Sequence, residues 1–153
     1  MDVSGLQKLT LLDYPGRVAC TVFTGGCNLR CPFCHNASLA LPERERDVIG
    51  HEELMAFLKK RVGILDGVAV TGGEPLLHAG LEGLLSEIKA LGYAVKLDTN
   101  GTFPARLRAI VEAGLADRVA MDIKASPERY AAVTGVPGLD LGPIKESVAY
   151  LMA

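Results

Sequence analysis

Three cysteines crowd into eight positions of this chain, at Cys27, Cys31 and Cys34. They follow a short apolar run and the pair Gly25 and Gly26, which predicts that they lie on a loop. Packing gives no reason for three thiols so close together, whereas a loop that wraps thiolates around one inorganic centre does. Cysteine thiolates hold iron–sulfur clusters, and the common electron-transfer clusters use four of them. A four-iron cluster on this loop would keep one iron open to a substrate, as an open position distinguishes catalytic zinc from structural zinc.

A glutamate follows a second apolar run, directly after two glycines. Gly72 and Gly73 would let the backbone approach a ligand closely, and the carboxylate of Glu74 could accept hydrogen bonds from an ammonium group. The alternative for Glu74 is an exposed position in a β-turn.

Two aspartates end neighbouring predicted strands and are expected to point toward the same mouth. Asp98 and Asp122 could together bind a cation there, because carboxylate oxygens are ligands for hard cations. The alternatives are a helix N-cap at Asp98 and a surface ion pair between Asp122 and Lys124, which share one face because they are two residues apart on a strand.

Strands and helices alternate along the chain in a way that would position these groups. Runs of β-branched and apolar residues predict strands at residues 18–23, 68–71, 93–97 and 119–124. Apolar residues at helical spacing predict helices around residues 51–62, 81–91, 107–111 and 144–151. A helix start is also expected at residues 126–128, where serine, proline and glutamate follow one another. Residues 1–16 are expected to be a lead-in that ends in a turn, and residues 42–46 a charged, solvated segment.

This alternation predicts βαβ units and parallel strands, and therefore an α/β fold. Four units are visible, half of a closed eightfold barrel, so we expect a partial (β/α) barrel in one domain over residues 1–153. The polar loops all fall at strand ends, and ligands bind at that edge in open and closed α/β sheets alike. The last helix has no stop signal, which in half a barrel favours a C-terminally truncated chain over a naturally minimal one.

Composition and charge argue against several classes of protein. At 153 residues, with 49% hydrophobic and 22% charged residues, the chain has an ordinary globular composition. Its net charge of −2 gives no indication of a nucleic-acid surface or a polybasic membrane patch. No apolar stretch approaches the roughly 20 residues of a membrane helix, and residues 1–12 lack the features of a signal peptide. We therefore expect a cytoplasmic protein whose thiols stay reduced.

The spacing Cys27-x3-Cys31-x2-Cys34, with the aromatic Phe33 before the last cysteine, resembles the signature of the radical S-adenosylmethionine (SAM) enzymes. GGEP at residues 72–75, one helix further on, resembles the second motif of that superfamily, and the resemblance runs from about residue 14 to about residue 150. It implies that the three cysteines bind a [4Fe–4S] cluster and that the methionine moiety of SAM chelates the open iron of that cluster. One electron then cleaves the sulfonium to methionine and a 5′-deoxyadenosyl radical.

Further short sequences are similar to those of the glycyl-radical-enzyme activases. They are CHN at residues 34–36, DTNG at residues 98–101 and Asp122-x-Lys124. The resemblance is greatest to pyruvate formate-lyase activase and to the activating proteins of anaerobic ribonucleotide reductase, and DYPG at residues 13–16 favours the second group. It implies that the chain makes a radical on a backbone glycine of a partner protein. The expected electron donor is flavodoxin or ferredoxin.

The same resemblance implies which residues hold the cosubstrate. Those expected to contact SAM are Phe33 (at the adenine), Gly72, Gly73, Glu74, Asp98, Asn100 and Lys124. Those expected around a monovalent cation are Asp98, Thr99 and Asp122, with the carbonyl of Ala120. The family's next SAM contact is a histidine on a later strand, and His51 and His78 are expected to be surface residues rather than substitutes for it.

Three alternatives remain open at this point. His35 could complete a Cys3His zinc site, although Cys34 and His35 are adjacent and zinc ligands usually come as two separated pairs. A non-catalytic iron–sulfur or zinc module would bind no SAM. A radical SAM enzyme acting on a small molecule, such as 7-carboxy-7-deazaguanine synthase, would keep the cluster and SAM. Cys20, in a predicted strand, is expected to be a small buried hydrophobic residue and not a fourth ligand.

Overall fold

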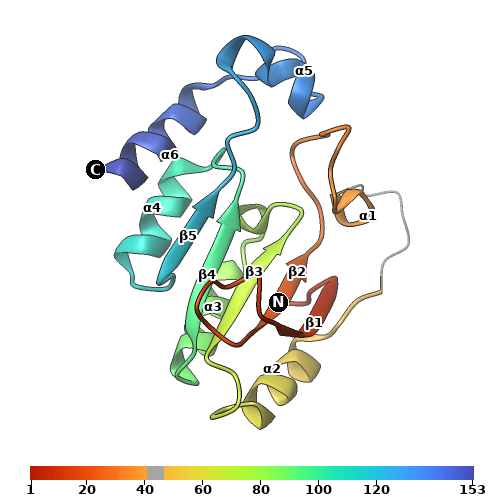
Figure 1. Ribbon diagram of the computed structural model, residues 1–153, viewed down its shortest axis with the longest axis vertical. Helices are drawn as coiled ribbons and strands as arrows, with labels where there is room; N and C mark the ends of the chain where they lie inside the picture. The colour runs from red at the N-terminus through yellow and green to blue at the C-terminus, as the bar shows by residue number, and fades with distance from the viewer. Residues whose placement is uncertain (41–46) are drawn as a thin grey trace.

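The structure, a computed structural model, describes residues 1–40 and 47–153, so the charged segment predicted at residues 42–46 lies outside the described residues. Within them, five strands form one sheet in the order β1-β2-β3-β4-β5 (Figure 1). The strands are β1 (Gly5–Thr10), β2 (Ala19–Thr24), β3 (Gly67–Gly72), β4 (Ala94–Thr99) and β5 (Arg118–Met121). Strands β2 to β5 run parallel, and β1 pairs with β2 in the antiparallel direction.

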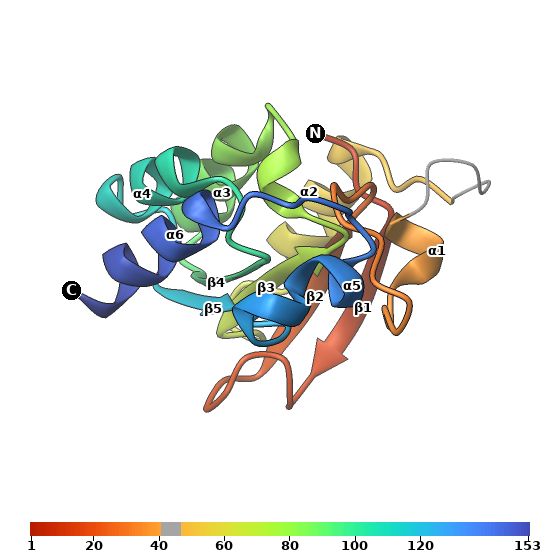
Figure 2. The same ribbon diagram turned by 90° about the horizontal axis from the view of Figure 1, so that it is seen from above.

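Helices that connect the parallel strands gather on one face of the sheet, as Figure 2 shows from above. They are α2 (His51–Lys60), α3 (Leu81–Ala90) and α4 (Pro104–Glu112), and α6 (Gly142–Met152) packs against α4. Shorter segments are α1 (Ala37–Ala40), α5 (Tyr130–Thr134) and the single 3-10 turns η1 (Pro75–Leu77) and η2 (Pro127–Arg129). In the described ranges, no helix has both the length and the apolar character that crossing a membrane requires.

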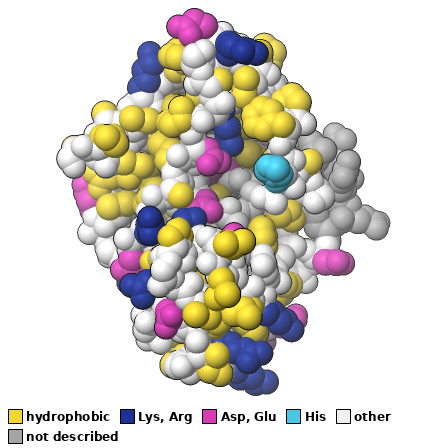
Figure 3. All heavy atoms as spheres, viewed as in Figure 1, with side chains coloured by type: hydrophobic (Ala, Val, Ile, Leu, Met, Phe, Trp, Pro, Cys, Tyr) yellow, Lys and Arg dark blue, Asp and Glu magenta, His cyan; other side chains and the backbone are white. Residues whose placement is uncertain are grey.

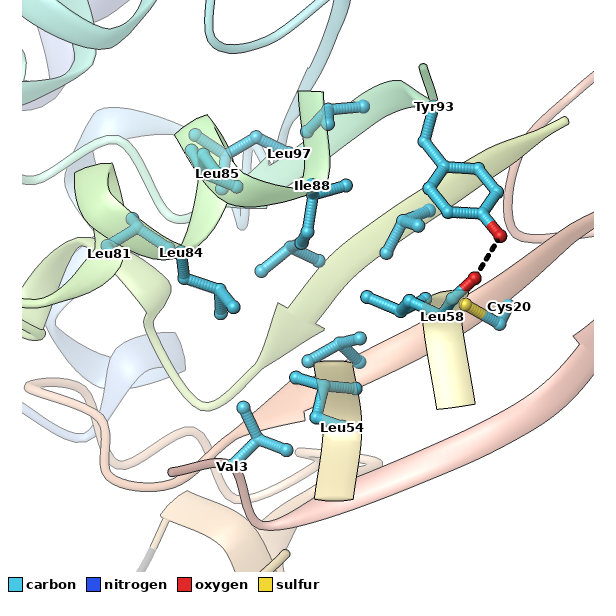
Figure 4. Packing of buried hydrophobic residues seen from close by; sticks show 14 of the residues in the cluster. Val3, Cys20, Leu54, Leu58, Leu81, Leu84, Leu85, Ile88, Tyr93 and Leu97 are labelled. Atoms are coloured by element: carbon cyan, nitrogen blue, oxygen red, sulfur yellow. Dashed lines mark hydrogen bonds between the residues drawn. The ribbon is translucent and has the colours of Figure 1, made fainter. Parts of the chain in front are cut away.

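The core fills the space between this face of the sheet and its helices. Side chains alternate along a strand, so one set from each central strand faces the helices. This set comprises Cys20, Val22, Val68, Val70, Val95 and Leu97, which pack with Leu54, Leu58, Leu84, Leu85, Ile88, Leu107 and Ile110. The hydroxyl of Tyr93 reaches into the same cluster and donates to the Leu58 carbonyl over 2.7 Å, which satisfies its polar end (Figure 4).

The α/β architecture and the four parallel strands confirm the fold class predicted from the sequence. The expectation of a plain lead-in over residues 1–16 is wrong, because these residues contain β1. Strand β1 is an edge strand with an exposed stretch from Gln7 to Leu9, and it carries few of the β-branched residues that reveal a strand in sequence. The last predicted strand is also too long, since β5 ends at Met121 and residues 122–124 leave the sheet.

Candidate functional site

The carboxyl ends of the four parallel strands meet at one edge of the sheet. The register pairs Thr24 with Gly72 and Thr99 with Met121, and these four residues are the last of β2, β3, β4 and β5. A pocket of about 350 Å³ lies beside them. Figure 3, in the same view as Figure 1, shows acidic, basic and histidine side chains around the middle of the molecular surface. The pocket is lined by Cys27, Leu29, Cys31, Phe33, Cys34, His35, Asn36, Ala40, Thr71, Gly72, Gly73, Asp98, Thr99, Asn100, Asp122, Ile123 and Lys124.

The pocket collects the three cysteines and all but two of the residues predicted to hold the cosubstrate or a cation. The exceptions are Ala120 on β5, which does not line the pocket, and Glu74, which is fully buried behind the pocket wall. Phe33, by contrast, lines the pocket with a side chain that is 57% exposed. The predicted contacts with cluster, SAM and cation remain predictions, but their residues now share one location.

The two glycines after β3 are required by the approach of two backbones. Gly72 has a φ of +123°, and a Cβ there would lie 2.3 Å from backbone atoms of Thr24. A Cβ on Gly73 would lie 1.9 Å from the carbonyl oxygen of Gly26. The Glu74 amide donates to that same carbonyl over 2.8 Å. The loop after β3 is therefore locked against the start of the cysteine loop, and only residues without a Cβ permit this contact.

The Glu74 carboxylate binds other parts of the protein. Its Oε1 accepts hydrogen bonds from the Leu76 amide (3.1 Å) and the Thr99 hydroxyl (2.7 Å), and its Oε2 accepts from the Asn100 amide (2.7 Å). Burial raises the pKa of Glu74 above its usual range, although these hydrogen bonds act in the opposite direction. These hydrogen bonds make Glu74 a support for the end of β4. Its contact with an ammonium group stays a prediction.

Asn100 extends this support to the cysteine loop. Its Nδ2 donates to Oδ1 of Asn28 over 2.9 Å and lies 3.9 Å from the Cys27 sulfur. Asn28 in turn donates to the Thr102 hydroxyl over 2.9 Å. A polar chain thus runs from buried Glu74 through Asn100 to the residue that follows the first cysteine.

Sequence reasoning missed three of the polar residues that hold these loops. Besides Asn28, they include Asn36, which donates to the Gly72 carbonyl over 3.3 Å, and His78, whose Nε2 lies 2.7 Å from the Gly25 carbonyl. His78 is a partly exposed residue, as expected, but its ring also makes this contact with the cysteine loop. No periodic pattern marks a side chain that bonds to a distant backbone, so the sequence carries little signal for these roles.

The three side chains expected around a cation each have a protein partner. Asp98 accepts from Nζ of Lys96 over 2.5 Å, and Asp122 accepts from Nζ of Lys124 over 3.1 Å. The Thr99 hydroxyl donates to Glu74. Burial raises the pKa of Asp98, although Lys96 lowers it by hydrogen bond and charge.

Lys124 carries a charge that faces both an acid and the cysteines. Desolvation opposes that charge, but the carboxylate of Asp122 and the neighbouring Cys31 and Cys27 outweigh it and raise the pKa of Lys124. Burial raises the pKa of the Cys27 and Cys31 thiols, and the charge of Lys124 acts against this rise at Cys31. Lys124 is therefore the cation placed to stabilise negative charge on the cysteine side of the pocket.

The arrangement of the thiols suits a cluster better than a single metal ion. Among residues 1–40 and 47–153, no three His, Cys, Asp or Glu side chains converge closely enough to hold one ion. A structural zinc site needs such convergence, because its ligands lie about 2.0–2.3 Å from one ion. A four-iron cluster binds each cysteine through a different iron, so three thiols spread around one pocket fit its requirements.

Cys20 lies apart from the other three cysteines. It is fully buried on β2 within the core, and burial raises its pKa to about 12. This confirms the prediction of a small buried hydrophobic residue.

Comparisons with known proteins find similar sequences over most of the chain. Residues 21–153 match the family described as the Radical SAM superfamily. A protein of Methanocaldococcus jannaschii, provisionally named a glycyl-radical enzyme activating enzyme, is 36% identical over 132 residues, which is 84% of this chain and 52% of that protein. A 7-carboxy-7-deazaguanine synthase of Hyperthermus butylicus is 38% identical over 96 residues, covering 62% of this chain and 40% of the relative. A GTP 3′,8-cyclase of Alkaliphilus oremlandii is 33% identical over 127 residues, covering 80% and 39%.

A solved structure has a similar fold. QueE from Escherichia coli matches with a TM-score of 0.55 and 21% identity, over 66% of this chain and 52% of that one. The similarity confirms the predicted α/β fold as a partial barrel. The chain spans about half of the length of the M. jannaschii relative and of the QueE chain, and less of the other relatives.

Proposed function

This chain belongs to the radical SAM superfamily, and on that premise we propose that it cleaves SAM reductively and generates a glycyl radical on a partner enzyme. One observation carries the proposal. Three cysteines, Gly72 and Gly73 of the GGEP loop, and Lys124 line one pocket. The name of the M. jannaschii relative supports activation of a glycyl-radical enzyme in particular. We propose the cytoplasm as the compartment, because the thiols must stay reduced.

We assign cluster binding to Cys27, Cys31 and Cys34. These thiolates would hold a [4Fe–4S] cluster, which would supply the electron for cleavage and an iron at which the cosubstrate could bind. Lys124 stabilises negative charge beside Cys31, where both the thiolates and the cosubstrate carboxylate would need it.

SAM is assigned to the rest of the pocket. The backbone of Gly72 and Gly73 faces the ammonium end, and the exposed ring of Phe33 is available to stack on adenine. Asn100 lines the same wall. Glu74 acts indirectly here, because its carboxylate holds the end of β4 in place. We include no monovalent cation, since the side chains expected to bind it have protein partners.

The reaction balances with one external electron. Flavodoxin or ferredoxin supplies that electron, a carbon–sulfur bond of the sulfonium breaks, and methionine leaves. The adenosyl fragment then takes a hydrogen atom from a backbone glycine, which gives 5′-deoxyadenosine and a glycyl radical. We propose anaerobic ribonucleotide reductase as the partner, on the resemblance of residues 13–16. Ile123, an exposed apolar residue in the pocket wall, suits a protein loop as the substrate.

A second function has a specific observation in its favour. A 7-carboxy-7-deazaguanine synthase matches this chain at 38% identity over 96 residues. Such an enzyme would use the same cluster and cosubstrate on a small molecule. The two functions differ in where the hydrogen atom comes from.

The test is an anaerobic reaction of the iron–sulfur-loaded protein with SAM, dithionite and an anaerobic ribonucleotide reductase. We expect 5′-deoxyadenosine in the chromatogram and a glycyl radical in the electron paramagnetic resonance (EPR) spectrum of the reductase. The radical should not form when the partner's radical glycine is replaced with alanine. It should also not form when the Cys31→Ala variant is used in place of the wild-type chain. Formation of 5′-deoxyadenosine with no radical on any glycyl-radical protein would favour the small-molecule function. Absence of SAM cleavage would contradict both.

A further inference from the structure

Strand β4 and the segment just past β5 each carry an acid and a lysine two residues apart, in opposite order. Along β4 the order is Lys96 then Asp98, and just past β5 it is Asp122 then Lys124. The register pairs Asp98 with Ala120, and just past β5 the Asp122 amide donates to the Thr99 carbonyl over 3.1 Å, so Asp122 lies beyond Asp98 in the strand direction. Lys96 and Asp98 share one face of β4 because they are two residues apart on a strand, and Asp122 and Lys124 are joined by an ion pair of 3.1 Å. The two carboxylates therefore lie between two ammonium groups in the direction of the strands.

The Lys96–Asp98 pair is the more buried of the two. Lys96 is 8% exposed, and its Nζ lies 2.5 Å from Oδ1 of Asp98. The Asp98 side chain is 30% exposed, against 70% for Asp122. A buried ammonium group and a largely buried carboxylate are costly to desolvate, and each supplies the opposite charge that the other requires.

A bound cation at Asp98 would have to compete with this ammonium group. The predicted cation ligands were Asp98, Thr99 and Asp122, yet the Thr99 hydroxyl donates to Glu74 and Asp122 pairs with Lys124. The residues present thus satisfy one another and do not form a cation site.

We propose that the ammonium group of Lys96 takes the place of a bound monovalent cation beside Asp98, and that the pocket functions without one. Lys96 is a positioning residue in this proposal, because it acts on the pocket through Asp98 and does not line the pocket itself. The proposal holds whichever substrate the pocket serves, so it does not rest on the activase function.

The test compares thermal unfolding in potassium chloride and in tetramethylammonium chloride at equal ionic strength, at a pH where carboxylates are charged. The wild type should unfold at the same temperature in both salts. Lys96→Met should unfold at least about 5 °C lower in tetramethylammonium, as expected when one partner of a buried pair is removed from a domain of this size. Potassium should restore at least half of that loss, because the freed carboxylate can then bind it.

Two further variants keep this test specific. Lys89→Met removes an ion pair with Asp117 (2.7 Å) on the helix-covered side, and its unfolding temperature should not respond to potassium. The double variant Lys96→Met with Asp98→Asn removes both buried charges, so it should be more stable than Lys96→Met in tetramethylammonium and lose the potassium response. If the double variant unfolds as easily as the single one, Lys96 acts through packing and the proposal is wrong.

Direct cation binding provides the second readout. Thallium(I), a spectroscopic substitute for potassium, should show no saturable binding to the wild type by thallium-205 nuclear magnetic resonance and should bind Lys96→Met. Saturable binding to the wild type that is lost in Asp98→Asn would overturn the proposal, and so would a Lys96→Met protein indistinguishable from the wild type in both salts.

Discussion

The same strand that supplies a cysteine to the core leads into the loop that supplies three to a pocket. Cys20 is fully buried among the helix-facing side chains of β2, and its thiol pKa is about 12. Cys27, Cys31 and Cys34 follow after the strand ends and are partly exposed around a pocket. One residue type therefore serves two purposes within fifteen positions of the chain, and its place relative to the strand end decides which.

The two regions are also stabilised differently. The core depends on apolar side chains from β2, β3 and β4 packed against helices (Figure 4), so it tolerates residues of similar shape. The pocket depends on backbone contacts between loops, on two glycines and on the buried carboxylate of Glu74. Changes in the core should therefore alter stability, whereas changes at the loop junction should alter both stability and the pocket.

The largest expected effect comes from the loop cysteines. Replacing Cys27, Cys31 or Cys34 with alanine should reduce bound iron from about four atoms per chain to almost none, because the remaining two thiolates cannot hold a cluster. Cys20→Ala should keep the full iron content. Iron and sulfide analysis after anaerobic reconstitution measures both, and equal iron content in all four variants would remove the distinction between the two regions.

The glycine junction should show the next largest effect. Gly73→Ala would place its Cβ 1.9 Å from the Gly26 carbonyl oxygen. The substitution should lower the free energy of unfolding by about 3 kcal/mol and weaken cluster retention. Gly83→Ala on α3 is the matched control, because its Cβ would meet no atom within 4 Å. It should stabilise the chain by about 0.5–1 kcal/mol. Urea denaturation gives both values, and a Gly73→Ala protein as stable as the wild type would show that the junction is not tight.

Thiol labelling should separate the four cysteines of the cluster-free protein by rate. A thiol reacts as its thiolate, so Cys20, with a pKa of about 12 and no exposure, should react at least about 100-fold more slowly than the loop thiols. Mass spectrometry after timed treatment with iodoacetamide would give the order of modification. Early labelling of Cys20 would contradict its place in the core.

The smallest expected effect comes from removing an ion pair between α3 and α4 whose contribution to stability depends on pH. The same arginine also joins these helices to the loop after β3. Arg106 on α4 bonds to Glu82 on α3 and to the carbonyls of Leu76 and His78. The hydrogen bond from Arg106 lowers the pKa of Glu82, so the pair stabilises the fold at neutral pH and this contribution is lost as the carboxylate becomes protonated in acid. The pair is partly exposed, so Glu82→Gln should cost only about 0.5 kcal/mol.

Urea denaturation of Glu82→Gln and the wild type at neutral pH and at about pH 3, below the usual glutamate pKa, checks this sign. The difference between the two proteins should shrink at the lower pH. A difference that stays constant or grows would contradict the assignment.

Sequence patterns predict the core strands better than they predict the contacts around the pocket. Strands β2 to β5 could be predicted because buried parallel strands are short apolar runs, and the site residues because they follow those runs. Strand β1 could not, since an exposed edge strand needs only backbone pairing. The contacts of Glu74, Asn28 and His78 could not either, because a hydrogen bond between loops distant in sequence leaves no periodic signal.

The central claim is that the three-cysteine loop holds a [4Fe–4S] cluster with one iron open to SAM. The most direct measurement is the EPR spectrum of the reduced, reconstituted protein with and without SAM. We predict a four-iron signal whose shape changes when SAM is added. Adenosine, which lacks the methionine moiety that would bind the iron, is the control and should leave the signal unchanged. A reduced cluster whose spectrum is unaffected by SAM would contradict the account.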